Sequence, residues 1–418
     1  MGPTILIVVK RLGSYKSTYV ACFIGYGVQA IVNTFLPLLF LTFQDSYGIP
    51  LEQITLLVTI NFLMQLSIDA LSGKFVEKIG YRKTMIIAHA FAFIGLGLLA
   101  FLPDLLPSAF AGLLISVIVY SLGGGLLEVV VSPIVEACPS KNKETTMSLL
   151  HSFYCWGYVL VVGLSTLYFF LFGTDKWQIL ALVWAVVPLF NLIFNFFVPY
   201  PDEAKEKEAG MRVIQLLKSP VFILMFLMIM ASGAGEQAIS QWVPSIAESL
   251  GIGKTLADLL GPLTFALAMG LSRLLFALAG KKINLNAYMG ISVILLICSY
   301  LLICLSPWPW LSLLGSALAG FSVSIMWPGV LSKAAVALPL GGASMYAILA
   351  LGGDLGATVG PSLVGYAASF FDDDLKIGVA FGIVFPAILA ICLFVSMALE
   401  WKKAKKEAEL SKRDHTAE

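Results

Sequence analysis

The stretch Gly73-Lys-Phe-Val-Glu77-Lys78-Ile-Gly80-Tyr81-Arg82-Lys83 separates two apolar runs, residues 51–72 and 84–103. Each run is long enough to cross a lipid bilayer, which takes roughly 20 residues of helix. The basic side chains between them are typical of a loop on the cytoplasmic side of a membrane. The glycines Gly73 and Gly80 permit a tight turn, and Glu77 can bind helix N-terminal amides or the guanidinium of Arg82. The stretch therefore predicts two membrane helices joined by a short cytoplasmic clamp.

The composition extends this interpretation to the whole chain. Of 418 residues, 59% are hydrophobic and only 12% are charged, and the mean hydropathy is +0.92. A soluble domain carries about 25% charged residues, so this chain needs lipid as its solvent. Its net charge of +1 argues against a nucleic-acid partner. The six cysteines have no metal-binding spacing, so we expect neither a metal site nor a cofactor.

Apolar runs of membrane-spanning length occur twelve times along the chain. The expected spans are residues 17–43, 51–72, 84–103, 108–137, 145–172, 177–198, 219–247, 256–280, 287–305, 310–338, 342–371 and 377–400.

The distribution of Lys and Arg predicts the orientation, because these residues are concentrated on the cytoplasmic side. If the N-terminus is cytoplasmic, 21 of the 26 Lys and Arg residues lie inside and three lie in outer loops. The remaining two, Arg273 and Lys333, lie within spans, and we expect Lys333 to reach the nearby membrane surface. The chain is thus expected in the cytoplasmic (inner) membrane, with both termini in the cytoplasm.

The polar stretch at the middle of the chain predicts two six-helix halves. The expected organisation is an N-terminal bundle (1–198), a cytoplasmic linker (199–218), a C-terminal bundle (219–400) and a cytoplasmic tail (401–418). The halves resemble each other. Gln29 and Asn33 in the first span, and Gln237 and Gln241 in the seventh, are amide pairs four residues apart on one helix face, and a proline follows each pair. Such repeats are a known transporter plan, with the site between the halves.

The Gly73–Lys83 stretch resembles the major facilitator signature G-x-x-x-D-[RK]-x-G-x-[RK]-[RK], with Glu77 in place of the aspartate. The resemblance implies an all-α membrane protein with twelve transmembrane helices in two pseudo-symmetric six-helix bundles. It also implies a secondary transporter that works by alternating access as a monomer, and not an enzyme.

A narrower resemblance covers the fourth and fifth spans. Glu128-Val-Val-Val-Ser132-Pro133 is similar to the E-x-x-x-N-P of the fucose permease branch, and Leu150-His151-Ser-Phe153-Tyr154-Cys-Trp-Gly157 is similar to its A-Q-x-F-N-x-x-G. This likeness implies a sugar substrate, a coupling role for Glu128, and substrate contacts from His151 and Tyr154. The branch's coupling aspartate on the first helix is replaced here by Thr34. Symport with H⁺, symport with Na⁺ and uniport therefore all stay open.

Polar and aromatic side chains within the spans supply the candidate site, because an ionisable group in a span costs about 3 kcal/mol or more. Asp354, midway along the eleventh span, is a second ion-coupling candidate, and glycines around it form a small-residue stripe for close helix packing. Asp69 and Arg273 occupy equivalent places in the two halves, so a gating interaction between them is one possibility and separate pairing within each half is the other. The expected substrate contacts are Gln29, Asn33, His151, Tyr154, Gln237, Gln241, Trp242 and Trp327.

Two other functions compete with sugar transport. A multidrug or metabolite exporter shares the expected fold, although amide pairs favour a hydroxylated substrate over an apolar one. A membrane sensor that does not transport is the alternative of a different class. An enzyme is disfavoured because the chain has no P-loop, G-x-S-x-G or H-E-x-x-H motif.

Overall fold

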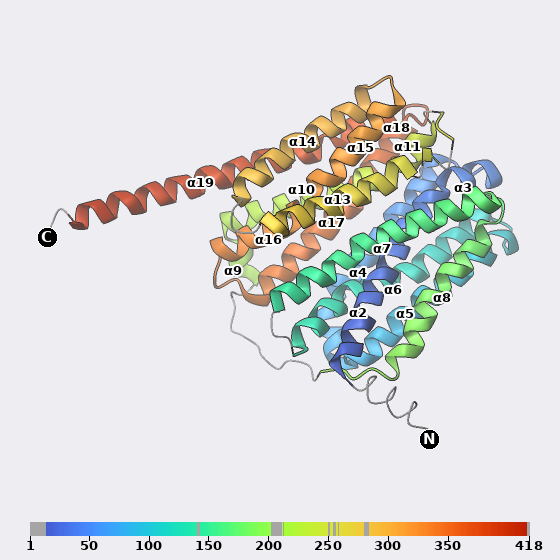
Figure 1. The fold of residues 1–418 in the computed structure, drawn as a ribbon, viewed down its shortest axis with the longest axis horizontal. Coiled ribbons are helices and arrows are strands. Elements are labelled where there is room, and N and C mark those ends of the chain that lie inside the picture. The colour runs from blue at the N-terminus through green and yellow to red at the C-terminus, as the bar shows by residue number, and fades with distance from the viewer. Residues whose placement is uncertain are drawn as a thin grey trace.

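The computed structural model describes residues 14–139, 143–201, 211, 213–249, 251–253, 256–257, 259–279 and 284–415. All secondary structure in these residues is helical, and the helices run roughly parallel to one long direction of the molecule (Figure 1). The first half contains α2 (Tyr15–Thr34), η1 (Leu36–Leu39), α3 (Phe40–Tyr47), α4 (Leu51–Ile79), α5 (Tyr81–Leu105), α6 (Ala109–Ala137), α7 (Lys143–Phe172) and α8 (Trp177–Asn195).

The second half follows a short helix, α9 (Val213–Leu217), which lies in the expected linker; residues 202–210 and 212 of that linker lie outside the described residues. Its helices are α10 (Pro220–Ser240), α11 (Val243–Ser249), η2 (Leu259–Leu263), α13 (Thr264–Ala279), α14 (Leu285–Leu305), α15 (Pro309–Val323), α16 (Met326–Ala337), α17 (Gly342–Ser369), α18 (Leu375–Gly382) and α19 (Val384–His415).

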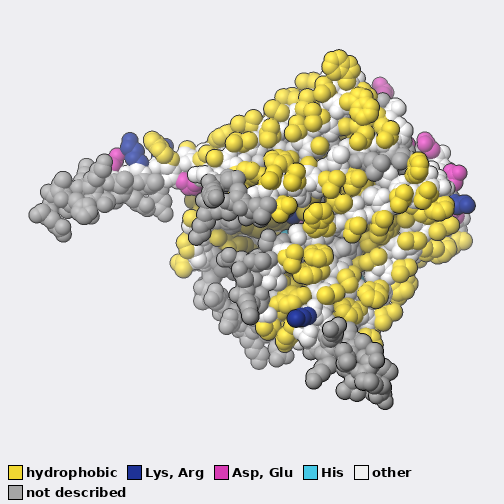
Figure 2. All heavy atoms as spheres, in the orientation of Figure 1, with side chains coloured by type: hydrophobic (Ala, Val, Ile, Leu, Met, Phe, Trp, Pro, Cys, Tyr) yellow, Lys and Arg dark blue, Asp and Glu magenta, His cyan; other side chains and the backbone are white. Residues whose placement is uncertain are grey.

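Eleven segments of the described chain are long and apolar enough to cross a membrane, and a shorter apolar helix, Leu260–Phe276, falls within the expected span 256–280, the eighth along the chain. The prediction of an all-helical membrane protein is therefore confirmed. Figure 2 shows hydrophobic side chains covering the flank of the helical body, and many large apolar side chains are exposed there. A surface of this kind is stable only against lipid.

The expected loop at residues 73–83 is mostly helix, which corrects the predicted boundary. α4 continues through Ile79 and α5 begins at Tyr81, so Gly73 is helical and the turn is made at Gly80 alone. Gly80 has φ +88°, a backbone conformation that glycine adopts without steric cost. Arg82 donates from Nη1 to the Phe196 carbonyl oxygen at 2.9 Å. Arg82 therefore ties this turn to the end of α8, while the Glu77 side chain lies outside the described residues.

The first helix of each half is interrupted close to its amide pair: just after Asn33 in the first half and at Gln241 in the second. α2 ends at Thr34 and gives way to the 3₁₀ turn η1 and then α3, whereas α10 ends at Ser240 and α11 begins at Val243. Pro37 and Pro244 lie just beyond these ends. Because proline has no N–H, it cannot bond the carbonyl four residues earlier, and the helix is interrupted at that point.

The two halves meet mainly through α4 with α17 and α7 with α13. We call the end of the bundle where α2 begins and α19 leaves the termini end, and the opposite end, where α3, α11 and α18 lie in Figure 1, the far end. The contacts at the far end include a hydrogen bond of 2.7 Å between the hydroxyls of Thr59 and Ser362 and packing of Phe40 on Trp242, with ring centroids 5.3 Å apart. These contacts close the far end between the halves.

The glycine stripe of α17 packs directly against α10, as the sequence predicts. A Cβ at Gly356 would overlap the carbonyl oxygen of Met230, and one at Gly360 would overlap that of Ala234. The two backbones can approach this closely only because neither position has a side chain.

We predict that Gly356→Ala lowers the stability of the purified protein by about 1–3 kcal/mol, because the added methyl forces α10 and α17 apart. Gly97→Ala is the matched control, since a Cβ at Gly97 in α5 meets nothing within 4 Å. Thermal unfolding in one detergent compares the two variants. Equal melting temperatures for both would contradict the close packing.

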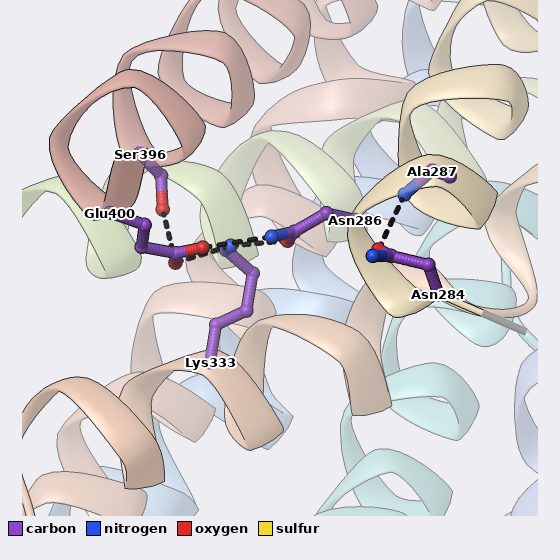
Figure 3. Close-up of polar contacts among 6 residues, drawn as sticks. All are labelled: Asn284, Asn286, Ala287, Lys333, Ser396 and Glu400. Atoms are coloured by element: carbon purple, nitrogen blue, oxygen red, sulfur yellow. Dashed lines mark hydrogen bonds and ion pairs between the residues drawn. The ribbon is translucent and has the colours of Figure 1, made fainter. Parts of the chain in front are cut away.

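An ion pair between a buried lysine and a half-exposed glutamate joins three helices of the second half near the termini end (Figure 3). Lys333 of α16 donates from Nζ to Glu400 of α19 and to Asn286 of α14, each at 2.6 Å. Asn286 in turn donates to the other carboxylate oxygen of Glu400 at 2.8 Å. The Lys333 side chain is only 4% exposed, whereas that of Glu400 is 46% exposed. Lys333 is thus buried and paired, and the expectation that it reaches the membrane surface is wrong.

We predict that Glu400→Gln destabilises the protein by at least about 1 kcal/mol more than Lys333→Met. The first change leaves a buried ammonium without its counter-ion, whereas the second leaves a half-exposed carboxylate that water can solvate. Unfolding free energies of the two variants test this. The opposite order would mean that the pair contributes through packing of the lysine stem.

Candidate functional site

A cavity of about 670 Å³ lies between the two halves. It is lined by α2, α4, α6 and α7 of the first half and by α10, α13, α16 and α17 of the second. Its wall runs from Asn33 and Ala357 near the middle of the bundle to Ser132 and Tyr346 nearer the termini end. The cavity thus lies on the termini-end side of the contacts that close the far end, and its size suits a small-molecule ligand.

Most of the residues predicted from the sequence meet at this cavity. The lining includes ten of them: Gln29, Asn33, Asp69, Glu128, His151, Tyr154, Gln237, Arg273, Trp327 and Asp354. Their helices are far apart in the chain, so only the packing of the two halves brings them together.

Two predicted substrate contacts, Gln241 and Trp242, are not part of the lining. Gln241 lies one turn beyond Gln237 towards the far end and donates from Nε2 to the Asn33 carbonyl oxygen at 3.1 Å. Trp242 is fully buried and donates from Nε1 to the Pro361 carbonyl oxygen at 2.9 Å. Both side chains take part in far-end packing, because α10 carries them past the cavity to where the halves meet.

A network of buried amide side chains holds together the cavity wall that the first half of the protein contributes. The Asn33 Oδ1 atom accepts hydrogen bonds from Gln65 Nε2 at 2.8 Å and from Asn61 Nδ2 at 3.3 Å. Ser121 donates to Asn61 Oδ1 at 2.6 Å. Sequence reasoning missed Asn61 and Gln65, although Asn61, Gln65 and Asp69 are spaced four residues apart, as the amide pairs of α2 and α10 are.

The two segments that resemble the fucose permease branch converge on Tyr26. Its hydroxyl lies 3.0 Å from Ser132 Oγ on α6 and 3.4 Å from His151 Nδ1 on α7. The Tyr26 and His151 rings also pack together, with centroids 5.4 Å apart. Tyr26 was not singled out from the sequence, because nothing about a lone tyrosine in an apolar helix marks it as a site residue.

The carboxyl groups of the cavity gather on one side. Glu128 Oε2 accepts a hydrogen bond from Gln29 Nε2 at 2.8 Å. One carboxylate oxygen each from Asp69, Glu128 and Asp354 lie within 4.8 Å of one another. With Glu236, which the sequence analysis did not select, the lining has four carboxyl groups and one guanidinium, that of Arg273.

The structure does not pair Asp69 with Arg273. Arg273 donates from Nη1 to Cys155 Sγ at 3.1 Å and from Nε to the Ser324 carbonyl oxygen at 3.3 Å. The bond to Cys155 crosses from α13 to α7, so Arg273 does connect the two halves, through a different partner from the one considered.

Comparison with known proteins agrees with this architecture. The family model of the Major Facilitator Superfamily matches residues 18–263 and 225–417. The comparison with curated protein sequences gave no match.

Two solved structures have the same fold at low sequence identity. One is the fucose:proton symporter FucP of E. coli, with 13% identity and a TM-score of 0.63, covering 92% of this chain and 99% of that chain. The other is a bacterial homolog of the human lysosomal transporter Spinster in an inward-facing, unoccupied conformation, with 13% identity and a TM-score of 0.71, covering 90% of this chain and 96% of that one. At this identity the likeness establishes the fold and does not select a branch. The chain belongs to the Major Facilitator Superfamily and is a multi-pass secondary transporter, not an enzyme.

Proposed function

We propose that this transporter carries a small sugar through the cavity by alternating access, coupled to a cation. The observation that carries the proposal is the mixture of side chains in the lining. Gln237 and Tyr154 offer hydrogen-bond donors and acceptors, His151 adds a ring nitrogen, and Trp327 offers an aromatic face. A neutral polyol needs donors and acceptors together, and an amide supplies both. The similarity to a fucose:proton symporter supports the same substrate class.

We further propose that the termini end is cytoplasmic, as the Lys and Arg distribution predicts, and that the membrane is the cytoplasmic one. The cavity then lies on the cytoplasmic side of the closed far end, which corresponds to an inward-facing state. The similarity to a Spinster homolog in an inward-facing conformation supports this assignment. Alternating access then requires the far-end contacts to break and re-form in every cycle.

A second candidate function is export of a cationic compound. It is favoured by the excess of carboxyl groups over guanidinium groups in the lining, four against one. A cationic substrate would gain Coulomb energy from such a wall in a low-dielectric setting. A neutral sugar would gain none.

We predict that Gln237→Ala weakens sugar binding about fivefold or more, because a lost hydrogen bond in a desolvated cavity costs about 1–3 kcal/mol. Gln178→Ala is the matched control, since Gln178 bonds Asp104 within the first half and does not line the cavity. A thermal-shift screen of hexoses and cationic dyes on both variants, followed by uptake into liposomes, measures the effect.

The same experiment separates the competing functions. Stabilisation by dyes and not by sugars would favour the exporter. Binding of a solute without flux into liposomes would favour a sensor and would contradict transport.

We also predict that Gln241→Leu shifts the protein towards a state open at the far end. Pro37 cannot bond the Asn33 carbonyl, and Gln241 supplies the missing donor from the other half. Removing it leaves a buried carbonyl unpaired, at a cost of about 1–3 kcal/mol to the closed state.

The readout is labelling of Thr55→Cys, a buried far-end position, by a membrane-impermeant thiol reagent in a cysteine-free background. We expect labelling to be about fivefold faster or more with Gln241→Leu, corresponding to at least 1 kcal/mol. Gln178→Leu is the control. Unchanged labelling would remove Gln241 from the closure.

A further inference from the structure

The strongest unexplained feature of the cavity is the cluster formed by Asp69, Glu128 and Asp354. These residues come from α4, α6 and α17, and one carboxylate oxygen of each lies within 4.8 Å of the other two. Asp354 is only 8% exposed. Negative charges this close together and largely removed from water repel one another strongly. The arrangement therefore calls for a positive charge among the three oxygens.

Among the lining residues that the structure describes, the one cationic side chain is directed elsewhere. Arg273 is the one Lys or Arg among the lining residues that the structure describes, and its guanidinium donates to Ser324 and Cys155. The Nδ1 atom of His151 lies 3.4 Å from the Tyr26 hydroxyl.

A second, independent observation points to a ligand at the same place. Gln29 is 3% exposed, and its Nε2 atom donates to Glu128, which fixes its amide beside the cluster. Its other polar atom, Oε1, is buried and has no hydrogen-bond partner. Leaving a buried acceptor unsatisfied costs about 1–3 kcal/mol, so an orphaned oxygen on the amide that contacts Glu128 indicates a missing electropositive group.

We propose that Asp69, Glu128, Asp354 and Gln29 Oε1 bind a sodium ion. The proposal rests on the proposed ion-coupled transport and specifies its ion and ligands. All the ligands are hard oxygens, which select hard cations. Oxygens around an ion of the size of Ca²⁺, which Na⁺ nearly matches, lie about 2.3–2.6 Å from it, so ligands on opposite sides are about 5 Å apart. The cluster meets that limit. A monovalent ion is held half as strongly as a divalent one by the same charges, which suits release in every cycle.

The site would link ion binding to conformation because its ligands come from both halves. Asp69 and Glu128 belong to the first half and Asp354 to the second, and α4 packs against α17. Moving the halves apart would separate Asp354 from the other ligands, so the ion would favour the arrangement in which they meet. A shared proton is the competing occupant, since the carboxyl oxygens of Asp69 and Asp354 lie within 4.8 Å of each other.

Sodium binding by the full-length purified protein tests the proposal in the absence of any sugar. Melting temperatures are measured at fixed pH and ionic strength with NaCl, KCl or choline chloride, and with added CaCl₂ or MgCl₂. We expect Na⁺ alone to raise the melting temperature, in a saturable manner. The proposal is overturned if Na⁺ does not specifically raise the melting temperature of the wild type. It is also overturned if Ca²⁺ or Mg²⁺ raises the melting temperature more than Na⁺ does, or if the melting temperature responds to pH but not to Na⁺.

Variants then locate the site. Asp69→Asn, Glu128→Gln, Asp354→Asn and Gln29→Leu should each weaken Na⁺ binding at least tenfold by isothermal titration. Glu236→Gln, which removes a carboxylate of the same cavity outside the cluster, should leave the affinity within about threefold, because a more distant charge acts weakly. Equal losses in all five variants would indicate a general effect of cavity charge and would contradict a defined site. The result is independent of the substrate: sugar flux without Na⁺ binding refutes only the ion site, and Na⁺ binding without sugar flux refutes only the sugar assignment.

Discussion

The need to pair every backbone N–H and C=O within lipid governs this molecule. Helices meet that need by themselves, which is why all secondary structure in the described chain is helical. The exceptions lie where proline removes a donor. Pro37 leaves the Asn33 carbonyl without its helical partner, and Gln241 of the other half bonds it at 3.1 Å. A defect in one helix thereby becomes a contact between the halves, and one that a transporter can make and break without exposing the carbonyl to lipid.

The second constraint is the cost of placing charged side chains within the membrane. The Lys333–Glu400 pair and the carboxyl groups of the cavity meet this constraint in different ways. Lys333 and Glu400 satisfy each other with the help of Asn286 and Ser396, and the result is a fixed tie among α14, α16 and α19. The carboxyl groups of Asp69, Glu128 and Asp354 instead gather beside the cavity, with one oxygen of each within 4.8 Å of the other two. An ion pair within the protein stabilises one structure, whereas a carboxyl cluster at a cavity makes the structure depend on what binds there.

The comparisons with known proteins establish the fold of this chain but not its substrate or ion. The family match extends over both halves because the fold depends on features spread along the whole chain: apolar spans, glycine contacts and basic inner loops. Substrate and ion selectivity depend on the few polar and charged side chains that line the cavity. Two solved structures share the fold although each is only 13% identical to this chain, and one of them is named for fucose and proton symport. The likeness therefore establishes the fold, whereas substrate and ion selectivity depend on the residues of the cavity.

Local sequence determined much of this protein. Span length, the small-residue stripe at Gly356 and Gly360, the helix breaks near Pro37 and Pro244 and the membrane character all follow from properties of neighbouring residues. The helical continuation through Gly73 was missed, because basic side chains are compatible with both a loop and the end of a helix. Tertiary structure alone decided which polar groups face each other. Gln237 and Gln241 share one helix face, yet one lines the cavity and the other closes the far end, and Lys333 is buried against Glu400, 67 residues away. Asp69 likewise lies beside Asp354 and not beside Arg273. Spacing within a helix fixes the direction of a side chain, but the partner it meets depends on how separate helices pack, which no single segment encodes.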